Sequence, residues 1–166
     1  MQSRKPLSFF WLIVLALLVV VADQYTKWLV MSRFSLYETI SVLPGFFNLT
    51  YLHNTGAAFG LLANADPAWR VYFFVGIACG ALVFVLYAFQ QYRRRGLLYL
   101  FVFSFIGGGA AGNLIDRVRF GSVVDFLDFY VGAYHWPAFN VADSAIVVGV
   151  GLFLLAGFFD RDGERD

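Results

Sequence analysis

Long runs of hydrophobic residues, separated by short polar segments, dominate the pattern along the chain. The stretches 71–90 and 96–115 contain no charged residue, and a helix needs roughly 20 mostly apolar residues to cross a bilayer. Runs at about 7–31 and 141–159 are also long enough to span, although the first is interrupted near its end by two charged residues. The pattern predicts four transmembrane helices joined by short connections in one bundle.

The segment 32–69, between the first two runs, has a different pattern. Thr39 to Leu43 and Phe46 to Leu52 are rich in β-branched and aromatic residues and flank a Pro-Gly pair, which predicts two short strands around a turn. We therefore expect an all-α membrane protein, a bundle of four transmembrane helices with a small β-sheet resting on the membrane surface.

Composition narrows the class of protein. With 60% hydrophobic and only 14% charged residues, the chain cannot cover itself with a water-compatible surface, so residues 1–166 are expected to form a single membrane-embedded domain. A net charge of +1 with dispersed arginines argues against nucleic acid as a partner. One cysteine and two histidines without a ligand motif predict no metal site and no cofactor.

The basic residues predict the orientation. An even number of spans places both termini on one side of the membrane, and the positive-inside rule assigns that side to the cytoplasm because the tight loop there contains Arg93–Arg95. The segments 32–69 and 118–139 then face outward. The basic residues on the cytoplasmic side would be Arg4, Lys5, Arg93, Arg94, Arg95, Arg161 and Arg165.

Polar side chains gather at the outer ends of the predicted spans. Ionisable groups beside or within a membrane are costly and are by default candidates for function. A cluster on one side predicts a site open both to lipid and to the outer aqueous phase. Its members are Asp23, Asn54, Asn113, Arg117, Asp125, Asn140 and Asp143.

Several of these residues also have structural interpretations. Asp23 and Lys27 have the i,i+4 spacing of a helical ion pair with a snorkelling lysine, and Asn140 with Asp143 can cap the last helix. Arg117 could anchor its helix at the interface or hold a carboxylate. The small residues at 107–112 favour close helix packing.

Two neighbouring carboxyl groups have a specific chemical capacity. They cannot both ionise readily, so they share a proton, and the ionised member can activate water while the protonated member polarises a carbonyl. Asp125 and Asp143 therefore suggest aspartic-type peptide hydrolysis. A serine mechanism is disfavoured because Ser104, Ser122 and Ser144 have no histidine at a suggestive spacing.

Other assignments stay open at this level. A small ion-coupled transporter could use the acids as a proton relay, although its route should also have polar groups at mid-depth and at the cytoplasmic ends. A structural or chaperone membrane protein would tolerate neutralisation of either acid. Asp116 and Asp128 are interpreted as solvated or structural charges.

Five ordered motifs closely resemble those of the lipoprotein signal peptidase family, also called signal peptidase II, and they cover essentially the whole chain. They are Asp-Gln-x-x-Lys at 23–27, Asn-Thr-Gly-Ala-Ala-Phe-Gly at 54–60, Gly-Asn-Leu-Ile-Asp-Arg at 112–117, Val-Val-Asp-Phe at 123–126 and Phe-Asn-Val-Ala-Asp at 139–143.

The resemblance implies an aspartic endopeptidase of the bacterial cytoplasmic (inner) membrane. It would remove signal peptides from prolipoproteins, on the amino side of a cysteine that already carries diacylglycerol, at the periplasmic face. Its partners would be prolipoprotein substrates and membrane lipids, and we expect a monomer.

The resemblance also assigns roles to single residues. Asp125 and Asp143 match the catalytic dyad, and a half-helical lid is implied near Tyr134–Phe139. Residues lining the site would be Asn54, Asn113, Arg117 and Asn140; residues in supporting roles would be Asp23, Lys27, Gly56, Gly108 and Gly112.

Overall fold

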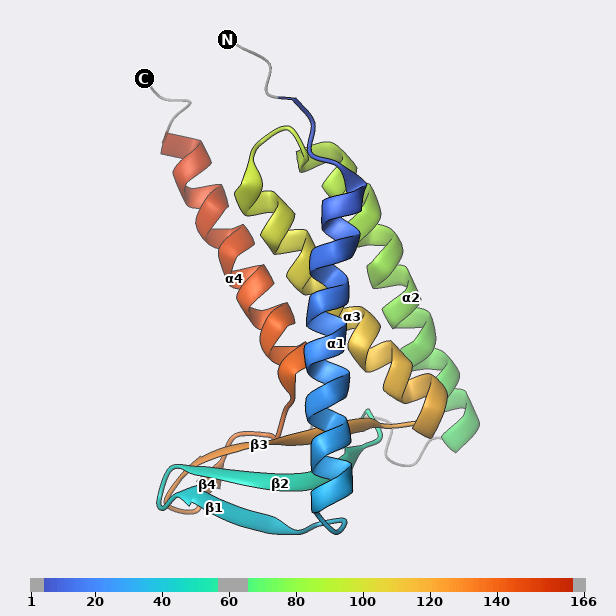
Figure 1. The fold of residues 1–166 in the computed structure, drawn as a ribbon, viewed down its shortest axis with the longest axis vertical. Helices are drawn as coiled ribbons and strands as arrows, with labels where there is room; N and C mark the ends of the chain where they lie inside the picture. Colours follow the sequence, from blue (N-terminus) through green and yellow to red (C-terminus); the bar gives the residue numbers. More distant parts are fainter. Residues whose placement is uncertain (1–4, 57–65, 163–166) are drawn as a thin grey trace.

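Four long helices and a four-stranded antiparallel sheet make up the parts of the chain that the computed structural model describes, residues 5–56 and 66–162. In chain order the elements are α1 (Phe9–Arg33), β1 (Thr39–Leu43), β2 (Phe47–Asn54), α2 (Pro67–Tyr92), α3 (Leu97–Phe120), β3 (Val123–Val131), β4 (Tyr134–His135) and α4 (Val141–Asp162). The helices run lengthwise beside one another and the sheet lies across one end (Figure 1). The predicted membrane bundle with a small sheet is confirmed.

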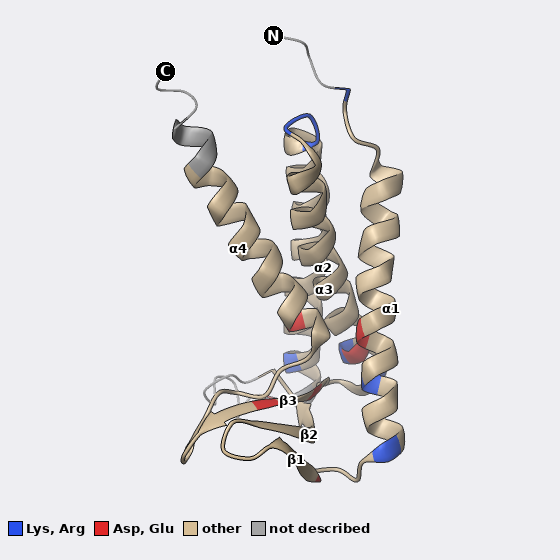
Figure 2. Ribbon diagram, turned by 60° about the vertical axis from the view of Figure 1, so that its left-hand side comes forward, with Lys and Arg blue, Asp and Glu red and all other residues tan. Residues whose placement is uncertain are grey.

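The outside of the bundle is apolar, as a lipid environment requires. Leu18, Val83 and Leu154 are each at least 60% exposed, and all four helices are long and apolar enough to cross a membrane. Lys and Arg mark the loop between α2 and α3, whereas the Asp and Glu positions lie toward the sheet, with further Lys and Arg positions among them (Figure 2). The charges thus lie at the two ends of the bundle, with an apolar zone between them.

The central helix is α3, which packs against α1, α2 and α4. Its glycines make this possible: a Cβ on Gly108 would come within 2.7 Å of a backbone oxygen of α1, and one on Gly109 would strike the backbone oxygen of Ala142 in α4. A Cβ on Gly112 would lie 2.6 Å from Asp23 Oδ2. The small residues therefore let α1 and α4 approach close enough for their polar groups to meet.

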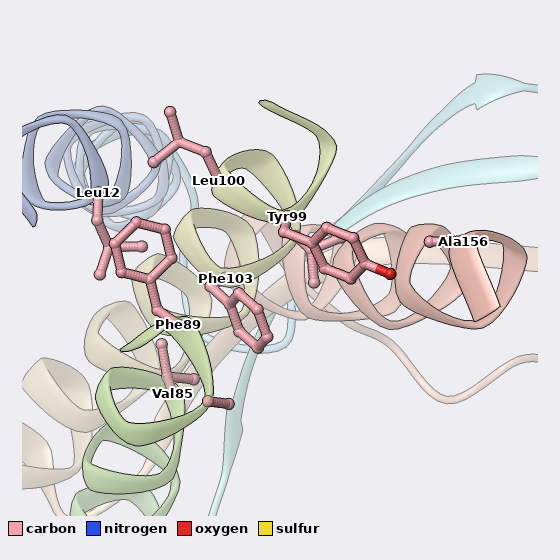
Figure 3. Packing of buried hydrophobic residues seen from close by; sticks show 9 residues of the cluster. Leu12, Val85, Phe89, Tyr99, Leu100, Phe103 and Ala156 are labelled. Carbon is pink, nitrogen blue, oxygen red and sulfur yellow. The ribbon is translucent and has the colours of Figure 1, made fainter. Parts of the chain in front are cut away.

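At the end of the bundle away from the sheet, aromatic and aliphatic side chains form the apolar core (Figure 3). There the backbone N–H of Leu7 donates to the carbonyl of Arg93 (2.9 Å), which ties the start of α1 to the α2–α3 loop. The buried cluster contains Leu12, Val85, Ala88, Phe89, Tyr99, Leu100, Val102, Phe103 and Ala156.

The sheet has the order β1-β2-β3-β4. The pairing of β2 with β3 places Leu52 opposite Asp125 and Asn54 opposite Val123. The sequence analysis expected two strands; β3 and β4 lie in the segment that it treated only as an outer loop. The sequence of β3 nevertheless has the β-branched and aromatic composition of a strand.

The expectation of a half-helical lid at Tyr134–Phe139 is wrong. Tyr134 and His135 form a strand that pairs with the end of β3 around a turn at Gly132, where φ is +61°. Phe139 is bridged to Leu127. The backbone groups of the segment bond to β3, which leaves them extended and unable to form helical bonds.

Candidate active site

Asp143 and Asn140 form a reciprocal cap at the start of α4. The Asp143 backbone N–H donates to Asn140 Oδ1 (2.9 Å), and the Asn140 backbone N–H donates to Asp143 Oδ2 (3.3 Å). This is the geometry of a capping box with Asp in the usual place of Glu. The expected capping role is therefore real, and it also fixes the direction of the Asp143 carboxylate.

Asn140 links the two candidate acids. Its side chain is fully buried, and its Nδ2 donates to Asp125 Oδ1 (2.7 Å) and to the carbonyl of Val124 (3.2 Å). One asparagine thus holds the Asp125 carboxylate through its side-chain amide nitrogen and the Asp143 carboxylate through its backbone N–H. The two carboxyl groups predicted to meet are brought together at the junction of β3 and α4.

Asp125 lies on β3 and is 2% exposed. Its second carboxyl oxygen accepts a hydrogen bond from Asn54 Nδ2 at 2.9 Å. Burial raises the pKa of Asp125 from 3.8 to about 7; the nearby charge of Asp143 adds to the shift, and the hydrogen bonds from Asn54 and Asn140 oppose it. Asp125 is therefore a carboxyl group that exchanges its proton near neutral pH.

Asn113 and Arg117 come from the outer end of α3. Asn113 Nδ2 donates to Asp143 Oδ1 at 2.7 Å. The Arg117 guanidinium lies over the ring of Phe74 (5.3 Å to its centroid) and donates to the Asn113 carbonyl (3.3 Å). Among the described residues it makes no ion pair with a carboxylate, so its remaining donors are not committed to the forked pair considered above.

Lys27 is the centre of a buried ionic network behind the dyad. Its ammonium lies 2.8 Å from Asp23 Oδ2 and 2.8 Å from Asp116 Oδ2, and it donates to Asn113 Oδ1 at 3.0 Å. Lys27, Asp23 and Asp116 are each at most 1% exposed. The lysine does not snorkel; it balances two buried carboxylates and orients the asparagine that holds Asp143.

Backbone contacts connect this network to two other elements, α4 and β3. Asp23 Oδ1 accepts from the N–H of Ala142 in α4 (2.9 Å), and Asp116 Oδ2 accepts from the N–H of Val124 in β3 (3.1 Å). Gln24 Nε2 donates to Asp116 Oδ1 at 2.8 Å. The motif at 23–27 contains Gln24 but gave it no role, and Asp116 was predicted to be a solvated or structural charge. The structure places Asp116 in the network as a buried structural acid.

Gly56 supports the site from the end of β2. It has φ +101°, and a Cβ there would strike the ring of Phe74, the ring that carries Arg117. Its N–H donates to Asn54 Oδ1 (2.9 Å), which orients the amide toward Asp125. The last four residues of the motif at 54–60 lie outside the described residues.

His53 and Ser122 form a contact that their spacing along the chain does not suggest. His53 Nδ1 lies 2.7 Å from Ser122 Oγ, and Tyr51 OH lies 2.9 Å from His53 Nε2. The two residues are 69 positions apart in the chain, and the pairing of β2 with β3 brings them together. Ser122 is only 4% exposed, so its hydroxyl fastens the two strands and is not presented to a substrate.

Asp128 is likewise structural. Its carboxylate accepts from Asn48 Nδ2 and lies 2.8 Å from His135 Nδ1, away from the contacts of the dyad. No group of three metal-binding side chains occurs among the described residues. What the geometry assembles is a pair of carboxyl groups with different surroundings, one buried and able to hold a proton, the other held by donors at a helix start.

Comparisons with known proteins bear on the family and the fold. Residues 15–159 match the family model described as signal peptidase (SPase) II. The lipoprotein signal peptidase of Syntrophotalea carbinolica is 52% identical over 161 residues, 97% of this chain and 98% of that protein, and that of Syntrophus aciditrophicus is 45% identical over 98% of this chain and 99% of that protein. A solved structure described as a bacterial membrane enzyme at 2.3 Å resolution is 33% identical, with a TM-score of 0.82 over 96% of this chain and 94% of that one.

Proposed function

The chain belongs to the signal peptidase II family, the lipoprotein signal peptidases, and on that premise we propose that Asp125 and Asp143 are the catalytic dyad of this membrane aspartic endopeptidase. The observation that carries the proposal is the link through Asn140, which contacts both carboxyl groups. No other described carboxyl pair combines contact through one residue with a pKa near 7 for one member.

Asp143 acts as the base and Asp125 as the acid. Asp143 accepts hydrogen bonds from Asn113 and from the Asn140 backbone, and it lies in the first turn of α4, where the helix dipole favours negative charge. Asp125 keeps a proton near neutral pH because it is buried. The two environments separate the two roles.

The reaction then follows with its protons balanced. Asp143 takes a proton from water, and the water oxygen attacks the scissile carbonyl carbon while Asp125 donates its proton to the carbonyl oxygen. Collapse of the tetrahedral intermediate breaks the C–N bond, with a proton passing from Asp143 to the leaving amine and another returning to Asp125. The products are a free signal peptide carboxylate and the amine of the mature lipoprotein.

Arg117, Asn54 and Asn113 hold the substrate and the dyad. Arg117 has donors left for a backbone carbonyl of the substrate, because its described contacts are the Phe74 ring and one carbonyl. Asn54 and Asn113 each fix one acid. Asp23 and Lys27, with Gly56, Gly108 and Gly112, act through packing and charge balance.

The substrate is a prolipoprotein whose cysteine, just after the scissile bond, carries diacylglycerol. The protein is a multi-pass protein of the inner membrane, and we place the sheet and the dyad at the periplasmic face because Arg93–Arg95 lie at the opposite end. A bond anchored by acyl chains stays at the membrane surface, which is the depth at which β3 meets α4.

The test is cleavage by purified protein in detergent of one precursor peptide in two forms, with diacylglyceryl cysteine and with free cysteine. Mass spectrometry should find a cut on the amino side of the lipidated cysteine and much slower cleavage of the free-cysteine form. The rate should be unchanged by chelator, because the dyad activates water unaided. Equal rates for the two peptides would contradict the lipoprotein substrate.

A further inference from the structure

An apolar groove begins at Asp143 and follows the outer face of α4. It has a volume of about 460 Å³, the size of a small-ligand site. Val147 is 70% exposed and Val148 48%, so the groove faces the surrounding lipid. Its lining residues are Trp136, Phe139, Asp143, Ser144, Val147 and Val148.

The polar atoms at the groove are turned away from it. Ser144 Oγ donates to the carbonyl of Asn140 (2.8 Å), and both oxygens of Asp143 accept hydrogen bonds from Asn113 and Asn140. The walls are therefore aliphatic and aromatic, and the carboxylate marks one end only.

The roof of the groove is held in position by the sheet. The N–H of Trp136 donates to the carbonyl of Phe129 (2.8 Å), and Phe139 donates to the carbonyl of Leu127 (3.1 Å). The rings of Phe139 and Phe129 stack with centroids 5.8 Å apart. One side of the groove is thus formed by aromatic residues whose backbone groups bond to β3, and Trp136 is 70% exposed.

We propose that this groove binds the first part of an acyl chain of the substrate's diacylglyceryl group. The inference rests on the proposed function: the lipidated cysteine directly follows the scissile bond, so its glyceryl group must lie within a few atoms of Asp143. The groove is continuous with the dyad at Asp143 and open to lipid along Val147 and Val148, which is the route that a chain leaving this cysteine needs.

The length of the groove favours the first part of an acyl chain over the helix of the signal peptide. From Asp143 to Val148, the α4 residues that line the groove, the helix rises about 7.5 Å. A helix of about 20 residues is about 30 Å long. An extended chain, at roughly 1.2 Å per bond, would place about six methylenes in the groove.

The groove fixes the position of the acyl chain and adds little to the affinity for the substrate. A chain that moves from the bilayer into the groove exchanges one apolar surrounding for another, so no large hydrophobic gain results. What it gains is a fixed direction next to Asp143, and misplacement of a reacting bond by about 1 Å can cost up to about 100-fold in rate.

The experiment fills the groove by substitution and varies the length of the acyl chains on the substrate. Val147→Trp fills it, Val148→Trp fills it from the next position, and Val83→Trp is the matched control at a lipid-facing valine of α2 that is 67% exposed. Precursor peptides carry diacetyl, dihexanoyl or dipalmitoyl glyceryl cysteine, and kcat/KM of each variant is divided by that of the wild type for the same peptide. This ratio cancels differences in how the peptides enter micelles.

For Val147→Trp and Val148→Trp we expect a ratio near one with the diacetyl peptide, a fall of about tenfold with dihexanoyl, and no further fall with dipalmitoyl. Val83→Trp should stay near one throughout. A ratio equal at all chain lengths, or one that follows changes in the signal sequence instead, would overturn the acyl-chain site. If the wild type cleaves none of the lipidated peptides, the proposed function itself fails, which is a different result.

Discussion

At the scale of single residues, the proposed mechanism makes the cleavage rate depend on the protonation of Asp125. Its pKa of about 7 comes mainly from burial, and as the acid it must hold its proton before the water attacks. We therefore expect kcat/KM for a lipidated precursor to fall as the pH rises through about 7. The control is Asp128→Asn, whose pH profile should match that of the wild type. If kcat/KM of the wild type rises with pH through the same range, Asp125 is the base.

Lys27 makes a second prediction at this scale. It neutralises Asp23 and Asp116, both buried, and removing one partner of a buried ionic group typically costs about 3–5 kcal/mol. Lys27→Met should lower the free energy of unfolding in detergent by a comparable amount. It should also reduce cleavage, because Asn113 Oδ1 loses the hydrogen bond from Lys27. Arg33→Met, at an exposed position of the same helix, should change stability little; equal effects of the two variants would contradict a structural ion network.

At the scale of elements, the approach of α4 to α3 positions the dyad. An added Cβ at Gly109 strikes the backbone of Ala142, one residue before Asp143, whereas a Cβ at Gly151 has nothing within 4 Å. Alanine normally stabilises a helix interior by about 1 kcal/mol relative to glycine. Gly151→Ala should thus be neutral or slightly stabilising, and Gly109→Ala should lower both stability and cleavage. Equal melting temperatures and rates for the two variants would show that the contact is unimportant.

The sequence predicted the elements whose signals are local. The four spans follow from the length of the apolar runs, and β1 and β2 follow from their composition. The capping role of Asn140 and Asp143 follows from their position at the start of an apolar run. The pairing of His53 with Ser122, and the shared lysine of Asp23 and Asp116, depend on strand register and on the crossing of α1 with α3. The i,i+4 spacing predicted the contact of Lys27 with Asp23, but no spacing in the chain encodes its contact with Asp116 or the hydrogen bond from Gln24 to Asp116.

Strand β3 is an intermediate case. Its composition indicates a strand, but it lies in a short loop between two spans, where a turn was sufficient to explain the chain. The structure uses it to place Asp125 beside the start of α4, where Asn140 and the Asn54 side chain at the end of β2 donate to its carboxylate. The Tyr134–Phe139 segment is extended because β4 and Phe139 pair with β3. This pairing is why the expectation of a helical lid there was wrong.

At the scale of the whole molecule, the bundle has one polar end for chemistry and one basic end for orientation. We predict that both termini and Arg93–Arg95 are cytoplasmic and that the sheet is periplasmic. A periplasm-dependent reporter fused at about residue 55 should be active and one fused at about residue 94 inactive. The reverse pattern would place the dyad on the wrong side for a lipoprotein precursor.

The central claim is that Asp125 and Asp143 together cleave the precursor, and the most direct measurement is the cleavage rate of the lipidated peptide by Asp125→Asn and Asp143→Asn. Each substitution keeps side-chain volume and removes half of the acid and base pair, so each should lower the rate by at least about 100-fold while the protein still inserts and purifies normally. Asp128→Asn, on the same strand but bonded to Asn48 and His135, should remain active. Substantial turnover by either dyad variant would contradict the account.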